Sequence, residues 1–166
     1  MARDSQRTKL YRAERAFWNN HAAGQYTPDF NKGGFHELVH QVESIWADAA
    51  VKKAFPEIAT RPVPNVKTNK RRGAHAAPYF NELAFSQGTC QPWVVIHELA
   101  HIIHYRIVFA DGQHATDQAD HGPEYAAVYL RLTEICFGFE AREGLAASFR
   151  KGRVKIAPKV VRARKI

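Results

Sequence analysis

The sequence predicts a single α+β domain, in which a small mixed or antiparallel sheet packs on a buried helix with additional helices around it. Three observations predict this fold class. The chain has 166 residues, 45% of them hydrophobic, which is enough for one core and short for two domains. Helical periodicity dominates both ends of the chain, and strand-like alternation is confined to its middle. One helical segment is apolar on nearly every side, as a buried helix is.

The N-terminal elements are expected to be helical. Apolar residues recur at helical spacing over residues 5–19, and Asp4 or Ser5 can cap that helix. A loop rich in Gly, Pro and Asn follows. The next helix contains the sequence HELVH and is expected to continue until Phe55-Pro56 stops it.

The strands are expected in the middle of the chain. Residues 61–72 combine prolines and charges with few apolar side chains, which indicates an edge strand or an extended loop. Residues 74–86 indicate two short strands around a turn near residues 78–81, with Leu83 and Phe85 directed toward the core. The remaining helices are expected at about residues 91–110, 123–137 and 139–149.

The net charge of +8 is concentrated at the C-terminus. Residues 1–149 are neutral overall, whereas residues 150–166 carry eight Lys and Arg and no acidic residue. We therefore expect one domain over residues 1–149 and a basic tail over residues 150–166. Such a tail can contact nucleic acid phosphates or an acidic protein surface, or it can simply be a solvated segment that aids solubility.

Cysteine content and hydropathy suggest a soluble, cytoplasmic protein. Cys90 and Cys136 are too few for a disulfide framework and have no C-x-x-C spacing, so we expect two reduced thiols. No apolar run approaches the roughly 18 to 20 residues that span a bilayer. The charged N-terminus lacks the apolar stretch of a signal peptide, and no membrane partner is expected.

The pattern H-E-x-x-H occurs twice, as HELVH at residues 36–40 and as HELAH at residues 97–101. On a helix, residues four apart share a face, so both histidines can bind one metal ion while the glutamate reaches a metal-bound water. A chain of this size rarely needs two such sites, and the surroundings of each copy must distinguish them.

The first copy lies on an ordinary amphipathic helix. Rotation by about 100° per residue gathers its apolar residues in one stripe. The stripe consists of Phe35, Leu38, Val39, Val42, Ile45, Trp46 and Ala49. His36 and His40 fall outside this stripe, beside Glu43, so we expect exposed histidines that match the pattern by chance.

The second copy lies on the helix that is apolar on nearly every side. Its polar residues gather in one sector about 120° wide. They are His97, Glu98, His101, His104 and Tyr105. Buried imidazoles and a carboxylate need partners, and a divalent cation with a bound water supplies them together. The alternative is a polar cluster held by hydrogen bonds alone.

A catalytic zinc usually has three protein ligands, so a third ligand is expected elsewhere. The metzincin pattern would need glycine and histidine at positions occupied by His104 and Ile107, which excludes that class. His104 lies about 10 Å along the helix from His97, too far to share its ion, and is expected in the core or near the ligands.

His121 is the expected third ligand. It precedes Gly122 and Pro123, which are suited to the cap and the first position of a new helix, so its backbone is constrained. Glu124 is the alternative, and it could otherwise sit in the first helical turn or hydrogen-bond a ligand histidine. Weaker candidates in the preceding polar connection are His114, Asp117 and Asp120.

These residues predict a zinc-dependent hydrolytic mechanism. Zinc lowers the pKa of its water toward 7, and Glu98 takes the proton as the water attacks a carbonyl and then carries it to the leaving amine. A donor to the developing oxyanion is also needed, and the candidates are His75, Tyr79, His114 and Tyr125. The strand around residues 83–86 could present an edge to a peptide, which would make the substrate a polypeptide.

The combination of HELAH, a loop and HGPEY resembles zincin metallopeptidases. RDSQRTKLYRAE at the N-terminus, with its Tyr-x-x-Glu pattern, and GAHAAPYFNELAF before the active helix are similar to a metallohydrolase family of actinobacteria and their phages, over about residues 3–149. The HG pair is more broadly similar to SprT-like and Spartan-like peptidases, some of which act on DNA-bound proteins. The resemblance implies His97, His101 and His121 as zinc ligands and Glu98 as the catalytic residue.

A location and two alternative functions complete the expectations, and the nucleic-acid function is indicated by the basic tail and by residues 67–72. A cytoplasmic location in a bacterial or phage-infected cell is expected. Two further functions stay open: a nucleic-acid-associated peptidase that acts on DNA-bound proteins, and a phage or structural protein with a non-catalytic zinc site.

Overall fold

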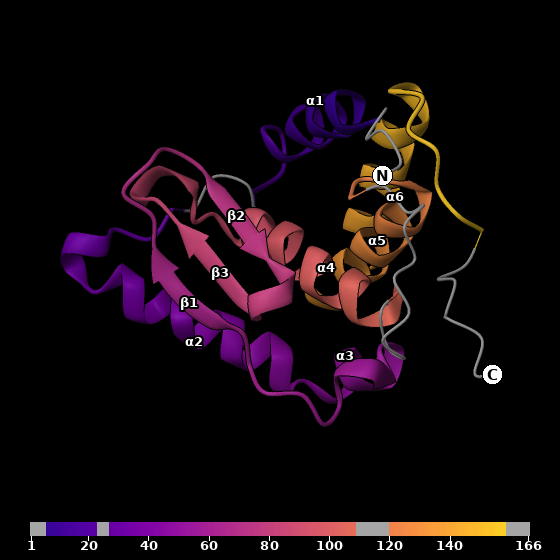
Figure 1. Ribbon diagram of the computed structural model, residues 1–166. Coiled ribbons are helices and arrows are strands. Elements are labelled where there is room, and N and C mark those ends of the chain that lie inside the picture. The colour runs from indigo at the N-terminus through magenta and orange to yellow at the C-terminus, as the bar shows by residue number, and fades with distance from the viewer. Residues whose placement is uncertain (1–5, 23–26, 109–119, 159–166) are drawn as a thin grey trace.

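A computed structural model describes residues 6–22, 27–108 and 120–158 (Figure 1). Its α-helices are α1 (Arg7–Trp18), α2 (Gly34–Ala47), α3 (Ala49–Ala54), α4 (Pro92–Val108), α5 (Pro123–Phe137) and α6 (Phe139–Lys151). Its strands are β1 (Asn65–Thr68), β2 (Ala74–Ala77) and β3 (Glu82–Phe85). The predicted α+β class is confirmed, with helices in the majority and one small sheet.

The sheet is mixed and has the strand order β1-β3-β2. β1 runs parallel to β3 and forms one edge, as the sequence of residues 61–72 predicts. β2 runs antiparallel to β3, and a 3-10 helix (Pro78–Phe80) joins them through Asn81, whose φ of 53° is left-handed. Leu83 and Phe85 are fully buried, so the two predicted strands around a turn are confirmed.

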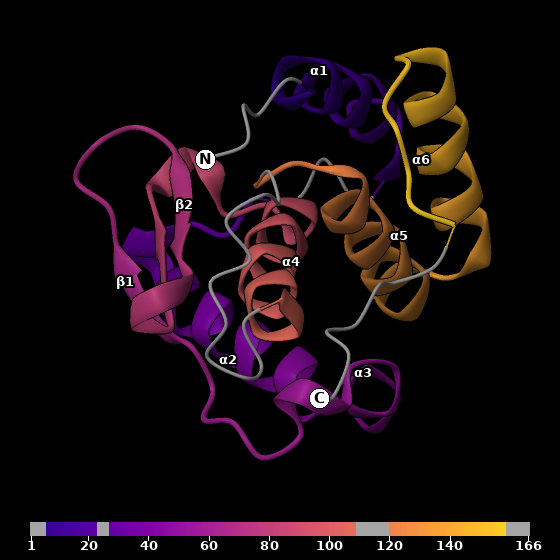
Figure 2. The same ribbon diagram turned by 45° about the vertical axis from the view of Figure 1, so that its right-hand side comes forward.

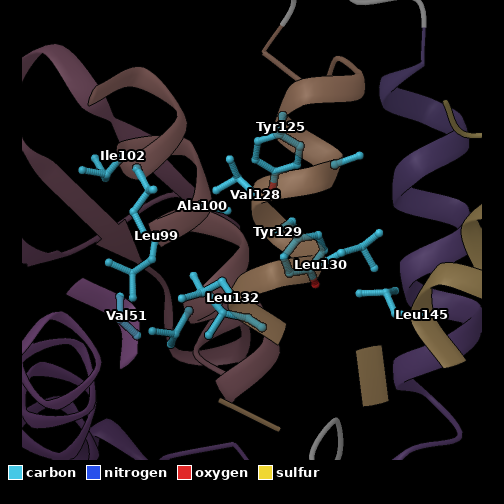
Figure 3. Close-up of a cluster of buried hydrophobic side chains, with 14 of the residues drawn as sticks. Val51, Leu99, Ala100, Ile102, Tyr125, Val128, Tyr129, Leu130, Leu132 and Leu145 are labelled. Atoms are coloured by element: carbon cyan, nitrogen blue, oxygen red, sulfur yellow. The ribbon is translucent and has the colours of Figure 1, made fainter. Parts of the chain in front are cut away.

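Helix α4 lies at the centre of the molecule, between the sheet on one side and α5 and α6 on the other (Figure 2). Most of its residues are buried, which confirms the prediction made from its apolar surface. Figure 3 shows how Leu99 and Ile102 of α4 lie in one cluster with Val128 and Leu132 of α5. The helix that carries HELAH is thus held from several directions at once.

The helical segment after residue 33 differs from the prediction, because it is two helices rather than one. The break is at Asp48, whose carboxylate accepts hydrogen bonds from the backbone amides of Ala50 and Val51 and so caps α3. The segment then ends at Phe55, before Pro56, as expected. An aspartate in an otherwise helical pattern can therefore restart a helix in a new direction.

The two ends of the described chain pack against each other, since α1 lies along α6 (Figure 1). Gln6 is the N-cap residue of α1 and makes no capping bond with its side chain, while the predicted caps Asp4 and Ser5 lie outside the described residues. At the other end, α6 includes Arg150 and Lys151, and Val154 is buried in the core. The first residues of the predicted basic tail therefore belong to the packed structure, and residues 159–166 lie outside the described part.

Within the described ranges, the helices are too short or too polar to cross a membrane.

Candidate metal centre

Three histidine side chains converge where α4 meets the start of α5. His97 and His101 lie one turn apart on α4, and His121 precedes Gly122, the N-cap of α5, and Pro123, its first residue. One ligand nitrogen from each imidazole lies within 4.8 Å of the other two. Among the described residues, no other His, Cys, Asp or Glu side chains form such a group of three.

The three imidazoles fit a zinc ion. Tetrahedral zinc binds histidine nitrogens at about 2.0–2.1 Å, which places them about 3.4 Å apart. Nitrogens within 4.8 Å need only small side-chain rotations to reach that spacing. Within the described part of the chain the group has three ligands, and three protein ligands with water in the fourth position are typical of a catalytic zinc site.

The alternative ligands that the structure describes lie outside this group. Glu124 is half-buried in the first turn of α5 and is not part of the cluster. Asp120 is exposed at the rim of the cavity in front of the histidines. His104 is buried with its ring 6.2 Å from the ring of Tyr125, which agrees with its predicted place in the core. His114 and Asp117 lie outside the described residues.

The histidines of the first H-E-x-x-H copy are exposed, as predicted. His36 and His40 lie on the outer face of α2, whereas Leu38, Val42 and Trp46 are buried on its inner face. Burial therefore separates the two copies of the pattern.

Glu14 of α1 is a site residue that the sequence reasoning did not assign. Its carboxylate accepts a hydrogen bond of 2.8 Å from Nδ1 of His97, and both side chains are only 4% exposed. Because a carboxylate only accepts, Nδ1 carries the hydrogen and Nε2 is left to face the metal position. A signal was visible in the sequence: Glu14 lies between Leu10 and Trp18 at a spacing of four residues, on the face of α1 that is buried.

Gln6 holds the backbone of His121. Its side-chain amide donates hydrogen bonds to the carbonyl of His121 at 2.7 Å and to that of Lys155 at 3.2 Å, and its oxygen accepts from the Lys155 amide at 2.9 Å. The amide of Ala157 also donates to the carbonyl of Pro123 at 3.0 Å. Both ends of the described chain thus fix the loop that presents the third histidine.

Two tyrosines of α5 form the floor of the site. Tyr125 stacks on the His101 ring at a centroid distance of 4.3 Å and donates a hydrogen bond of 3.0 Å to the carbonyl of His97. Beneath it, the Tyr129 hydroxyl accepts a hydrogen bond of 3.0 Å from Nε1 of Trp18. Burial raises the pKa of both phenols well above the usual value, so both hydroxyls keep their hydrogens.

The histidines differ in their tendency to protonate. Burial, together with the neighbouring His97 and His121, holds the pKa of His101 well below its usual value, which keeps it neutral and able to bind a metal. Burial also opposes the charged form of His97, but the charge and hydrogen bond of Glu14 outweigh it and raise that pKa. A metal at this site would therefore compete with a proton at His97.

Glu98 is the carboxylate of the centre. It is 6% exposed and borders the same cavity as His101 and His121. Burial raises its pKa, and the neighbouring His97 and the backbone of Ala76 oppose that rise. A carboxyl group with a raised pKa beside a cavity is suited to accept and return a proton near neutral pH.

Two adjoining cavities open beside Glu98. The first has a volume of about 230 Å³ and is bordered by His101, His121 and residues of β2. The second, of about 370 Å³, extends between α1 and the N-terminal half of α4, past Trp93. Four residues border both cavities: Arg7, Tyr11, Ala74 and Glu98. Together the cavities form a cleft along α1, in which His101 and His121 border the first cavity and His97 borders the second.

The strand that borders this cleft is β2, which corrects the expectation that residues 83–86 present the open edge. β3 pairs on both sides and has no open edge. In the antiparallel pairing, the carbonyl of Gly73 accepts from the amide of Ser86, so the backbone groups of Ala74 and Ala76 point away from β3. The order of the strands could not be read from local sequence.

The residues predicted as oxyanion donors occupy different positions relative to the cleft. Tyr125 is committed to the carbonyl of His97. Tyr79 is 76% exposed and borders neither cavity. His75 borders the first cavity, with Nδ1 3.4 Å from the Asn69 side chain. His114 lies outside the described residues.

Comparisons with family models, with curated proteins and with solved structures give no match to this chain. The functional conclusion therefore rests on the residues of the site.

Proposed function

We propose that the chain is a zinc-dependent metallopeptidase. The observation that carries this proposal is the convergence of His97, His101 and His121 beside the buried carboxylate of Glu98, which borders two adjoining cavities, one lined by His101 and His121 and the other by His97. Zinc held there would acidify a water molecule and polarise a carbonyl group. The chain supplies three neutral donors, a hydrogen-bonded carboxylate behind His97 and a nearby base, which together are the parts that this chemistry needs.

Glu98 acts as the proton carrier in this proposal. Its carboxylate takes a proton from the attacking water and gives it to the amine that leaves. Burial favours its protonated form, while the neighbouring backbone of Ala76 favours the ionised one. These opposing influences suit a group that changes protonation state twice in each turnover.

A polypeptide is the substrate that the cleft fits. The backbone of Ala74 faces the cleft from the open edge of β2, and an extended peptide can add to such an edge as a further strand. Ala76 of β2 and Glu98 border the same cavity, so strand addition would place the peptide next to the proton carrier.

Metal analysis tests the site. Purified wild type is expected to bind one zinc per chain, and His101→Ala and His121→Ala are expected to lose it. The double variant His36→Ala/His40→Ala is the matched control and should keep the wild-type content. Zinc loss in the control, or none in the two site variants, would contradict the proposal.

Proteolysis of an unfolded protein such as casein tests the activity. Glu98→Gln keeps the shape of the side chain and removes its basicity, so it is expected to bind zinc and to lose turnover by several orders of magnitude. Equal activity in Glu98→Gln and wild type would refute the peptidase and leave a non-catalytic zinc site.

A second candidate function is action on proteins bound to nucleic acid. The observation that favours it is a run of exposed basic residues in the loop between β1 and β2, Lys70, Arg71 and Arg72. Cations that neutralise phosphates make DNA affinity fall steeply with salt. Two variants are compared with wild type for oligonucleotide affinity at several salt concentrations. One replaces Lys70, Arg71 and Arg72 with glutamine, and the other lacks residues 159–166 but keeps the packed segment before them. Affinities that match in all three proteins would reject this candidate.

A further inference from the structure

Tyr11 lies beside the histidine cluster and has no role in the function proposed above. It belongs to α1, is half-buried, and borders both cavities together with Glu98. Its ring lies 5.0 Å from that of His121 in an edge-on arrangement and 5.5 Å from that of His97. Tyr11 is therefore the tyrosine that faces the open side of the cluster, whereas Tyr125 and Tyr129 lie beneath it.

Arg7 holds the phenol of Tyr11 from one turn earlier in α1. Its guanidinium carbon lies 5.3 Å from the ring centroid, and burial raises the pKa of the phenol while the charge of Arg7 lowers it to a smaller extent. Arginine has donors and no acceptor, so in any hydrogen bond between the two side chains the phenol oxygen is the acceptor. The hydrogen of the Tyr11 hydroxyl then remains available to another acceptor in the cleft.

We propose that the hydroxyl of Tyr11 donates a hydrogen bond to the oxygen of the scissile carbonyl as negative charge develops on it, and that Arg7 positions the phenol. This inference rests on the proposed peptidase function and supplies the oxyanion donor that the function lacks. Of the four donors expected from sequence, His75 is the described residue that competes with Tyr11 for this role. It borders the cleft, and its Nδ1 makes only a long contact of 3.4 Å with the Asn69 side chain.

The phenol keeps its proton throughout the reaction. Attack by water forms a new C–O bond, and the π electrons of the carbonyl move onto its oxygen, which accepts the hydrogen bond from Tyr11. Collapse returns that electron pair as the C–N bond breaks, and the leaving amine takes the proton held by Glu98. Tyr11 thus stabilises charge and takes no part in proton transfer.

Tyr11→Phe separates this role from packing, because the ring and its contacts with His97 and His121 remain. We expect kcat to fall by about 100-fold to 1,000-fold, as on loss of one oxyanion donor, with KM changed by less than about threefold. Zinc content should equal that of wild type. Arg7→Gln should give a smaller loss of kcat in the same direction, and the exposed Tyr79→Phe is the matched control with wild-type kinetics.

A binding measurement supplies a readout that does not depend on turnover. A phosphinic peptide, built on a bond that the enzyme cleaves in casein, imitates the charged tetrahedral state, and its affinity is measured by calorimetry. Tyr11→Phe should weaken this affinity by about the same factor as kcat, because both report the same hydrogen bond. The uncleaved substrate peptide, measured in a Glu98→Gln background, should bind equally with and without Tyr11→Phe.

Any of three kinetic or binding results overturns the inference while the peptidase function stands: full kcat in Tyr11→Phe, unchanged phosphinate affinity, or a loss of kcat that appears in His75→Ala instead. Zinc loss in Tyr11→Phe also overturns it, since the hydroxyl would then support the ligands. Failure of the function itself looks different, because wild type would show no zinc-dependent turnover that Glu98→Gln removes.

Discussion

Replacement of Glu14 gives the sharpest test of how α1 contributes to the candidate metal centre. Its bond to Nδ1 of His97 is 2.8 Å long, and both side chains are 4% exposed, so solvent cannot replace the carboxylate. Loss of a carboxylate behind a ligand histidine weakens metal binding by about 10-fold to 100-fold, or about 1.4 to 2.7 kcal/mol. Glu14→Gln keeps a hydrogen-bond acceptor but loses the charge, so it should weaken zinc affinity by about 10-fold, the lower of these values.

Glu14→Ala should weaken zinc affinity by about 100-fold, because the buried Nδ1 of His97 then loses its hydrogen-bond acceptor. Zinc affinity is measured by competition with a chromophoric chelator at fixed pH, and thermal unfolding of the metal-free proteins checks that each variant folds. Glu43→Gln on the exposed face of α2 is the matched control. Affinities within about twofold of wild type for both Glu14 variants would refute the reasoning that this contact orients His97.

Three further outcomes follow from contacts elsewhere in the fold. Gln6→Ala should lower the free energy of unfolding by about 1 to 3 kcal/mol, because it removes the side chain that donates to the buried carbonyl of His121. Urea denaturation measures this loss, and a change below about 0.5 kcal/mol would contradict the prediction. Asp48→Ala should cost about 1 kcal/mol in the same assay through loss of the α3 cap, and no loss would contradict that role. Burial and the charge of Asp48 raise the pKa of Cys136 to about 12. Iodoacetamide at pH 8 should therefore label this thiol roughly a thousandfold more slowly than an unfolded cysteine. Rapid labelling of the native protein would contradict this.

Burial is the property that made the histidine cluster predictable. The apolar residues around α4 showed that its histidines could not be solvated, and the stripe on α2 showed that His36 and His40 could be. His121 was predictable because Gly122 and Pro123 fix where α5 begins, and the structure has that start at Pro123. These inferences depend on local periodicity and helix caps, which are properties that a single sequence carries.

Contacts between distant segments were the part that local sequence did not reveal. Glu14 and His97 are 83 residues apart, and nothing in either helix specifies that they meet. The burial signal on α1 could have identified Glu14 as functional without naming its partner. The open edge of the sheet was misplaced for a related reason, because hydrophobic alternation predicts strands but not the order in which they pair.

The hydrogen bonds of Gln6 have a consequence for the newly made chain. They join the carbonyl of His121 to the backbone of Lys155, so the loop with the third histidine gains its support only when both have left the ribosome. Shorter nascent chains can form α4, but they lack the segment that holds this loop against α1. For the proposed peptidase, the metal site would then be completed late in synthesis, after the stage at which unfolded segments of the chain are most exposed to cleavage.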